Sequence, residues 1–599
     1  MKKQVFKMVS NVIIHNAKKW LFISIVINII LGFIPLMIIW LSKQIINEVA
    51  LIIQSGTINI KIITILLISE LITLSIREIL PSLQKVVDTE CEQNLDIILS
   101  LKVTEKSSNV PLLYFDNPDF NNHLERIHMN KGSRFMTPVK ALLKIFQNTI
   151  TVLSLLLFLI NIDWKLAIIT SFISIPVLIL HMFFGKQQFN LMKFQTPAAR
   201  KSFYYSTLLN TRTSASEIRL FQLKDIFIKR WKSLTKKNNE EALELEKKRE
   251  RAIALLNFLS LAINATITVY LIILSRKKVI DIGGFVSALQ TVENTRRALN
   301  DISSNIALIY SESLYINDLI SYLNYDDPNY IKSIRTENFP VQMRQGIKFE
   351  KVSFKYPYSD TLALDNISFD IKPGERIAIV GDNGSGKTTL VKCIMGLYQI
   401  DSGKISFDGV PLSKIKEEDV FKKITVIFQD FMKYNFSLKD NIILNSNVFN
   451  SSVNFEEKII NVTKQTGVYD FVKNYPRKFD TILGKVFTKG EDLSSGQWQK
   501  IALSRALYKE GEIFILDEPT SALDPLSELE IYEKFDALTK GKTTIFISHR
   551  MASTRLADKI IVLKKGKIVE IGTQHELLAN NGEYAKMYKM QSKWFEKAT

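Results

Sequence analysis

A glycine-rich stretch ending in lysine and threonine is the part of this sequence that points most directly to chemistry. It fits the pattern G-x-x-x-x-G-K-[ST], follows an apolar run at residues 376–380, and precedes a stretch of helical composition. Glycines let backbone N–H groups approach a phosphate, and a helix N-terminus favours an anion. We expect Lys387 to reach the β- and γ-phosphates of a nucleotide, and Thr388 to bind Mg²⁺. The predicted cradle consists of Gly381, Asp382, Asn383, Gly384, Ser385, Gly386, Lys387, Thr388 and Thr389.

A second site element is the adjacent pair of acids Asp517 and Glu518, which ends an apolar run at residues 513–516. A strand that ends in two acids places carboxylates at the sheet edge where the phosphate loop also lies. We expect Asp517 to hold the Mg²⁺ shell and Glu518 to act as the general base that polarises the attacking water. Together, the two elements predict a P-loop NTPase.

The surrounding pattern predicts how the chain is divided into domains. Residues 346–599 contain short β-branched runs with helical stretches between several of them, which is typical of an α/β domain. Residues 325–345 are polar and form a linker. Residues 1–324 carry the long apolar runs, and we expect them to form a membrane α-helical bundle.

Hydropathy alone predicts five membrane spans and a weaker sixth in this first part. Because the α/β domain needs cytosolic ATP, both chain termini belong in the cytoplasm, and the number of spans must be even. Six is the consistent count, although the basic residues 276–278 would then lie outside, against the positive-inside rule. The apolar runs lie at residues 21–41, 62–79, 149–160, 166–184 and 252–274, and the weaker stretch at 284–323.

The net charge of +18 allows two explanations, nucleic-acid binding or the positive-inside bias of a membrane protein. We favour the membrane protein, without a nucleic-acid partner, because the basic clusters flank apolar runs. The cysteines, Cys91 and Cys393, are too few for a disulfide framework, and the six histidines are scattered without metal-ligand spacing.

Glu70 and Arg77 interrupt the second apolar run. They are seven residues apart and therefore share a helix face. A structural ion pair, or one snorkelling group, is one interpretation, and the wall of a cavity that touches substrate is the other.

Further motifs resemble those of the ATP-binding-cassette (ABC) transporters, in that family's order. Residues 493–497 (LSSGQ) are similar to the LSGGQ signature, with a serine where the first glycine stands. The resemblance makes Gln429 the Q-loop residue, residues 521–524 the D-loop and His549 the switch histidine. Tyr356 resembles the aromatic residue that stacks on adenine. The implied site residues are catalytic Glu518, His549 and Gln429, nucleotide-binding Tyr356, Ser494, Ser495, Gly496, Gln497 and Asp524, and metal-binding Thr388, Gln429 and Asp517.

This resemblance implies an exporter half-transporter, with six spans and one ATP domain in each chain. In that family each nucleotide lies between the phosphate loop of one subunit and the signature of the other. We therefore expect a homodimer with two competent sites, in a bacterial cytoplasmic membrane. Coupling helices are expected near residues 117–126 and 214–222.

Within the ABC exporters the sequence most resembles the lantibiotic exporters of the nisin type. This implies a modified antimicrobial peptide, with its leader attached, as cargo, and peptide-modifying enzymes as membrane-associated partners. No cysteine precedes Cys91, so we expect no N-terminal cysteine protease domain, and another protein would remove the leader. The alternatives are a lipid or multidrug exporter and, from another class, a nucleotide-gated membrane sensor or channel. The resemblance rests on residues 114–120, 217–221, 428–431, 495–503 and 516–525.

Overall fold

The computed structural model divides the chain into two compact units. One comprises Met1–Asn109 and Asp119–Tyr325, and the other comprises Val110–Pro118 and Asp326–Thr599. Glu518, Asp524 and His549, which the sequence assigns to the site, lie outside the described residues. The structure describes every residue except 1–11, 13, 56–58, 118–119, 122–123, 125–126, 128–130, 326–334, 358, 445–454, 518–534, 538, 548–550, 552 and 597–599.

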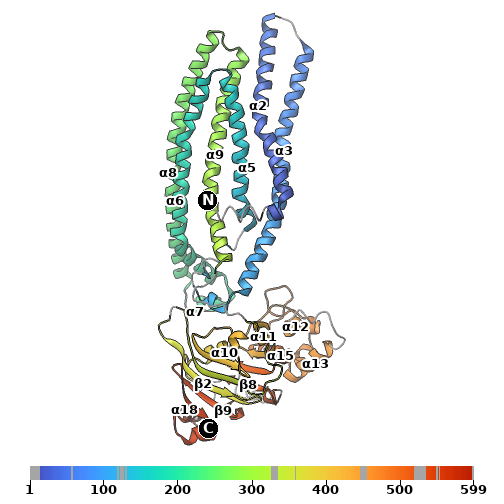
Figure 1. Ribbon diagram of the computed structural model, residues 1–599, viewed down its shortest axis with the longest axis vertical. Helices are drawn as coiled ribbons and strands as arrows, with labels where there is room; N and C mark the ends of the chain where they lie inside the picture. The colour runs from blue at the N-terminus through green and yellow to red at the C-terminus, as the bar shows by residue number, and fades with distance from the viewer. Residues whose placement is uncertain are drawn as a thin grey trace. The chain divides into compact units, whose positions relative to one another are not determined.

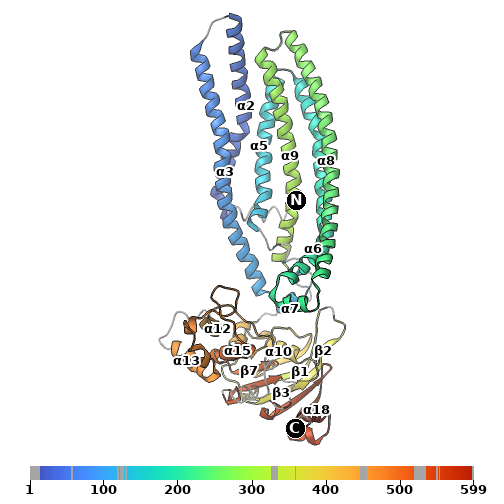
Figure 2. The same ribbon diagram turned by 180° about the vertical axis from the view of Figure 1, so that it is seen from behind.

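Long helices build the first unit, and they correspond to the six expected spans. Except for α9, each is much longer than its apolar run, because the helix continues into sequence that contains charged residues. In Figures 1 and 2, α2 lies beside α3 and α6 lies beside α8, with α9 packed between α5 and α6. The helices are α2 (Lys18–Ser55), α3 (Ile60–Asn109), α5 (Lys131–Ile160), α6 (Trp164–Asn210), the short α7 (Arg212–Leu220), α8 (Lys224–Arg276) and α9 (Ile282–Leu323).

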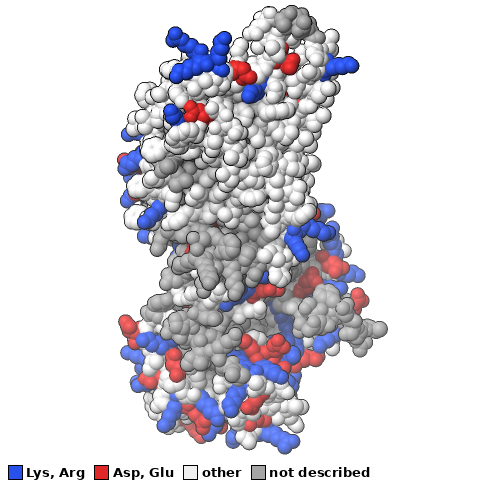
Figure 3. Space-filling view, turned by 45° about the horizontal axis from the view of Figure 1, so that its top comes forward, with Lys and Arg blue, Asp and Glu red and all other residues white. Residues whose placement is uncertain are grey.

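Many apolar side chains of this unit are exposed, as lipid-facing side chains are. Phe22 on α2 and Phe258 on α8 are both more than two thirds exposed. On the face shown in Figure 3 the helical unit is mostly uncharged, whereas the α/β unit carries both signs of charge. By length and composition, α2, α5 and α8 contain stretches that can cross a membrane.

Polar contacts tie α2, α3 and α5 together inside the unit. The Lys140 ammonium lies 3.1 Å from Asp88 and 2.8 Å from Glu92, and the indole of Trp20 donates to Asp88 at 2.8 Å. Of the interpretations left open for Glu70 and Arg77, the ion pair between them is not formed among the described residues. Glu70 accepts a hydrogen bond from Ser42 on α2, and Arg77 lies 3.9 Å from the neighbouring Glu78.

Two sheets form the α/β unit. The first is an antiparallel sheet in the order β2-β1-β4-β5, and the second has the order β10-β9-β3-β8-β7-β6, parallel except for the edge strand β10. The central strands β7 and β8 are wholly buried and β3 is buried except at Arg376, which explains their apolar runs. The strands are β1 (Ile347–Lys355), β2 (Leu362–Ile371), β3 (Arg376–Gly381), β4 (Ser402–Phe407), β5 (Val410–Pro411), β6 (Ile424–Ile427), β7 (Ile513–Asp517), β8 (Thr543–Ile547), β9 (Lys559–Lys564) and β10 (Lys567–Gly572).

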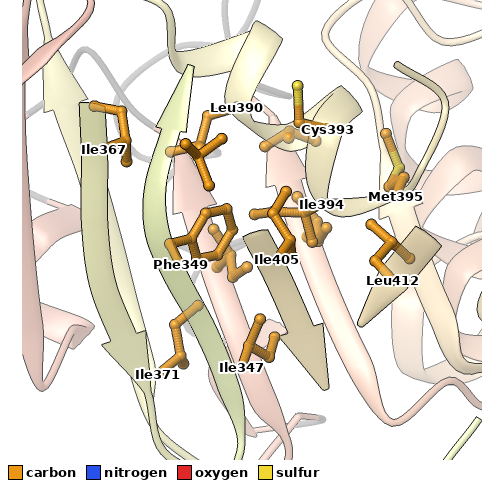
Figure 4. Close-up of a cluster of buried hydrophobic side chains, with 14 of the residues drawn as sticks. Ile347, Phe349, Ile367, Ile371, Leu390, Cys393, Ile394, Met395, Ile405 and Leu412 are labelled. Carbon is orange, nitrogen blue, oxygen red and sulfur yellow. The ribbon is translucent and has the colours of Figure 1, made fainter. Parts of the chain in front are cut away.

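Helix α10 packs between the two sheets, and its buried face contributes Leu390, Cys393 and Ile394 to the main core (Figure 4). Phe349 of β1 stacks on Phe369 of β2, with ring centroids 4.3 Å apart. The helices of this unit are α10 (Lys387–Ile394), α11 (Glu417–Lys423), α12 (Leu438–Ile443), α13 (Phe455–Thr466), α14 (Tyr469–Val472), α15 (Ser495–Lys509), α17 (Gln574–Ala579) and α18 (Glu583–Glu596), with 3-10 turns η1 (Leu112–Asp116), η2 (Leu412–Lys414), η4 (Lys478–Asp480) and η5 (Ser553–Leu556).

Candidate functional site

The phosphate loop runs from the end of β3 to the start of α10. The buried Lys387 side chain folds back along the loop, and its ammonium donates to the carbonyl oxygens of Gly381 and Asp382 at 2.9 and 3.0 Å. Asp382, Asn383 and Gly384 are exposed. The loop therefore carries a fixed positive charge beneath an accessible backbone turn, as an anion-binding loop requires.

The glycines of this loop fit the cradle of a nucleotide. Gly386 has a φ of +105°, and a Cβ there would lie 2.6 Å from the carbonyl oxygen of Ala363, so no other residue fits. Gly384 has a φ of +77°, and a Cβ there would meet nothing within 4 Å, so the loop faces open space. Ser385 Oγ is buried and has no hydrogen-bond partner among the described residues. These features match a loop shaped for phosphate oxygens.

The oxygen donors expected for Mg²⁺ come from different elements. The hydroxyl of Thr388, in the first turn of α10, donates to Asp517 Oδ1 at the end of β7, at 3.4 Å. The fold thus brings together two residues that are far apart in the sequence. Gln429 is exposed just beyond β6, the strand beside β7, so it lies along the same sheet edge.

Tyr356 lies beside the phosphate-loop helix. Its hydroxyl and Thr389 Oγ1 share a hydrogen bond of 2.9 Å. The ring packs edge-on against Phe354 and Tyr398, with centroids 5.1 and 5.6 Å away. Burial raises the pKa of Tyr356, while its hydrogen bond with Thr389 opposes that shift. A partly buried aromatic ring next to the loop has the position that a base-stacking residue needs.

The signature residues form the N-terminus of α15. Ser494 is the N-cap, and its hydroxyl accepts from the Gln497 N–H at 3.2 Å, while Gln497 Oε1 accepts from the Ser494 N–H at 2.9 Å. This capping box satisfies two terminal N–H groups and sets the direction of the helix. Ser494 and Ser495 are exposed and Gly496 is partly exposed, so this helix end is accessible to an anion.

Arg505 is a site-supporting residue that the sequence analysis missed. It lies about two turns after the signature on α15, and its guanidinium donates to the carbonyl oxygens of Asn441 and Met432, both at 2.7 Å. The guanidinium also lies 4.9 Å from the centre of the Tyr434 ring. Burial lowers the pKa of Arg505 to about 10. Arg505 therefore ties the signature helix to the segment that follows Gln429, and no local sequence pattern marks it for this role.

A second feature that the sequence analysis missed is that Val110–Pro118 belongs to the α/β unit. Its ordered part is η1, slightly earlier than the segment expected at 117–126, part of which lies outside the described residues. Leu113 of η1 packs on the main core, and Asp116 bonds to Tyr398. The second expected segment, 214–222, largely coincides with α7.

Comparison with known proteins identifies the α/β unit. Residues 364–521 match the family model described as ABC transporter. The chain is 32% identical to the subtilin transport ATP-binding protein SpaT of Bacillus subtilis over 581 residues, which covers 96% of this chain and 92% of SpaT. It is 33% identical to the nisin transport ATP-binding protein NisT of Lactococcus lactis over 575 residues, or 95% of this chain and 93% of NisT.

More distant relatives extend the comparison. The ATP-dependent lipid A-core flippase of Pseudomonas aeruginosa is 28% identical over 501 residues, covering 83% of this chain and 80% of the flippase. A solved structure of a bacterial Atm1-family ABC exporter with ATP bound superposes with a TM-score of 0.77. It is 19% identical and covers 96% of this chain and 99% of the exporter. This similarity confirms the predicted fold class, a transmembrane helical bundle fused to an α/β P-loop domain.

The family matches and the exporter fold together confirm that the chain is a membrane protein with a nucleotide-binding ATPase unit coupled to transport. They also confirm the predicted resemblance to the lantibiotic exporters. The chain belongs to the ABC exporter family, as a half-transporter similar to SpaT and NisT.

Proposed function

We propose that this chain forms a homodimer that exports a modified, lantibiotic-like peptide, with its leader attached, across a bacterial cytoplasmic membrane. The observation that supports this best is the extent of its similarity to SpaT and NisT. The similarity covers 95% or more of this chain and so includes the helical unit, where a cargo is bound. In this proposal both chain termini lie in the cytoplasm, and peptide-modifying enzymes deliver the cargo at the membrane.

The proposed chemistry is hydrolysis of ATP at the phosphate loop. The loop N–H groups and Lys387 bind the phosphate oxygens, and Tyr356 stacks on the adenine. Thr388, Asp517 and Gln429 would hold Mg²⁺, which when bound neutralises charge on the β- and γ-phosphate oxygens. Glu518 accepts the proton of the attacking water as the water oxygen bonds to the γ-phosphorus and the bond from that phosphorus to the β,γ-bridging oxygen breaks, which releases phosphate and ADP. His549 acts as the switch histidine.

The signature completes the site of the other subunit in this proposal. The exposed N-terminus of α15, with Ser494, Ser495, Gly496 and Gln497, faces the phosphates held by the partner chain, and Asp524 belongs to the same interface. The hydroxyl of Ser495 permits close approach of a phosphate. Closure of the two ATPase units around nucleotide opens the helical cavity outward, and hydrolysis resets it.

The first experiment measures the ATPase activity of the purified protein in lipid vesicles. Leader-bearing modified peptide, unmodified peptide, lipids and dyes are added separately. We expect stimulation by the leader-bearing peptide and uptake of that peptide by inverted vesicles. Stimulation by lipid or dye without a peptide response would overturn the peptide proposal and indicate a lipid or multidrug exporter. The similarity to the lipid A-core flippase is the observation behind this alternative.

A substitution tests the role of Glu518 separately. Glu518→Gln should remove turnover, because an amide cannot accept the proton, while ATP still binds. The matched control is Glu456→Gln, an exposed residue in the first turn of α13, which should leave turnover unchanged. Wild-type turnover in Glu518→Gln would contradict the assigned role. ATP-gated ion currents without movement of cargo would instead support the sensor or channel alternative.

A further inference from the structure

Helix α9, the sixth of the expected spans, has a polar exposed face. Gln290, Arg297, Asp301 and Ser304 are all exposed, and their spacing of three, four or seven residues places them on the same side of the helix. Arg297 lies about 22 Å along α9 from its start at Ile282, at a rise of 1.5 Å per residue. This distance is shorter than the hydrocarbon layer of a bilayer, which is about 30 Å thick.

The neighbouring helix α8 is apolar at the same depth. Leu261 lies as many residues before the end of α8 as Arg297 lies after the start of α9. Leu261 is 64% exposed and Val269 is 57% exposed, as expected for side chains that face lipid. A charged side chain in contact with lipid is costly, so charges at membrane depth face the interior of a bundle or a water-filled cavity. The polar face of α9 therefore borders water and not lipid.

Two guanidinium groups share one carboxylate on this helix. Arg296 donates to Glu293 through Nε at 3.0 Å and through Nη2 at 2.9 Å, and Arg297 donates to Glu293 through Nε at 2.9 Å. The Arg296 side chain is 22% exposed, whereas the Arg297 side chain is 69% exposed. Two positive groups and one negative group leave a net charge of +1, and its exposed part is the guanidinium of Arg297.

The terminal nitrogens of Arg297 donate no hydrogen bond to any residue that the structure describes. Asp301 lies one turn further along α9, but it forms no ion pair with Arg297 within the described part of the chain. The charge of Asp301 interacts instead with the ammonium of Lys144 on α5. Arg297 thus presents two free N–H-bearing nitrogens to the water-filled side of the helix, while Glu293 holds its Nε in place.

We propose that Arg297 binds a carboxylate of the cargo, so that the cavity favours peptides with aspartate or glutamate side chains. This proposal rests on the function proposed above, the export of a peptide. A guanidinium carries parallel N–H donors that match the two oxygens of a carboxylate, and such charge-assisted pairs are stronger than neutral hydrogen bonds. A phosphate group fits the same donors, so an anionic lipid is the competing ligand that the experiment must distinguish.

The test measures peptide binding to the full-length protein in vesicles of neutral phosphatidylcholine. The probes are fluorescently labelled, leader-bearing modified peptides: one carries aspartates and glutamates, and the other has asparagine and glutamine at the same positions. We expect the wild type to bind the acidic peptide about tenfold more tightly than the amide peptide, which is equivalent to about 1.4 kcal/mol. Arg297→Gln should remove this preference, whereas Arg297→Lys, which keeps the charge, should retain part of it.

A charge reversal separates recognition from folding. Arg297→Glu should bind a third peptide, with lysines at the same positions, more tightly than the acidic peptide, and a misfolded protein would not show such a reversed preference. Arg276→Gln is the matched control, because it makes the same change at an exposed arginine in the last turn of α8. Its preference for the acidic peptide should equal that of the wild type.

The possible failures are distinguishable. If Arg297→Gln keeps the tenfold preference for the acidic peptide, the proposal is overturned, and peptide export still stands. If the wild type binds none of the peptides, peptide export itself fails, and the role of Arg297 fails with it. Short-chain phosphatidylglycerol that displaces the acidic peptide from the wild type and is itself transported would assign Arg297 to a lipid phosphate and also overturn the proposal.

Discussion

The hydroxyl of Tyr398 donates a hydrogen bond to Asp116 Oδ2 at 2.9 Å. Asp116 ends η1, within the stretch Val110–Pro118 that follows α3, and Tyr398 lies in the α/β unit just after α10. The Tyr398 ring is also nearly perpendicular to the ring of Tyr356, which bonds to Thr389. A continuous set of contacts therefore runs from η1 to the phosphate-loop helix. Burial, followed by the bond to Asp116, raises the pKa of Tyr398, so this hydroxyl stays protonated at physiological pH.

Removing that hydroxyl should weaken communication between cargo binding and ATP hydrolysis. Tyr398→Phe keeps the ring packing but loses the hydrogen bond to Asp116, worth about 1 kcal/mol, together with the longer bond of 3.4 Å from Lys392. We expect cargo-stimulated ATPase activity to fall about fivefold relative to basal activity, while nucleotide binding is retained. Tyr475→Phe, in the same unit but away from η1, is the control. Equal stimulation in Tyr398→Phe and the wild type would show that this hydrogen bond does not couple cargo binding to ATP hydrolysis.

The two left-handed glycines of the phosphate loop should respond differently to substitution. Gly386→Ala adds a Cβ against the Ala363 carbonyl and must displace the loop, whereas Gly384→Ala meets open space and carries backbone strain of about 1–2 kcal/mol. We therefore expect Gly386→Ala to weaken ATP binding more than tenfold beyond Gly384→Ala. Titration with a fluorescent ATP analogue gives both dissociation constants. Equal affinities would contradict the assigned geometry of the loop.

The capping residue Ser494 allows helix stability to be separated from signature function. Ser494→Ala should lower stability by about 1 kcal/mol, because the hydroxyl no longer accepts from the Gln497 N–H. Ser494→Asp should restore the cap but place a negative charge where the partner's phosphates bind. We expect thermal unfolding to recover in Ser494→Asp while turnover stays low, and both to recover in Ser494→Thr. Turnover that follows stability in all three variants would argue against contact with a phosphate.

Complementation tests whether the signature acts on the partner subunit. Lys387→Ala should abolish phosphate binding by the loop, and Gly496→Asp should abolish the function of the signature. A homodimer of either variant should therefore be inactive. Mixed dimers pair the two damaged elements in one site and leave the other site intact. We expect ATPase activity to return when differently tagged variants are co-expressed and purified through both tags. If the signature instead served its own chain, the mixed dimer would stay inactive.

Local patterns were enough to predict the phosphate loop, the acidic strand end and the helical character of the first part. A glycine-rich turn, a buried strand and a long apolar helix each depend on neighbouring residues, because backbone sterics, hydrogen bonding and hydropathy act over short distances. The roles of Gln429, His549 and Tyr356 needed the resemblance to a family, since each residue type taken alone is common in structural positions. Glu518, Asp524 and His549 remain predictions outside the described residues.

The tertiary structure decided what no sequence window contains. The approach of Thr388 to Asp517 depends on the strand order of the sheet, which places β7 and β3 on either side of β8. The bonds of Arg505 to Met432, Tyr398 to Asp116 and Gln591 to Met551 join residues that are 40 to 282 positions apart. The sequence left an ion pair between Glu70 and Arg77 open, whereas in the structure Glu70 accepts a hydrogen bond from Ser42 on α2 and Arg77 lies near Glu78. Packing between distant elements determines which of these contacts form. The sequence by itself determines only which side chains each element carries.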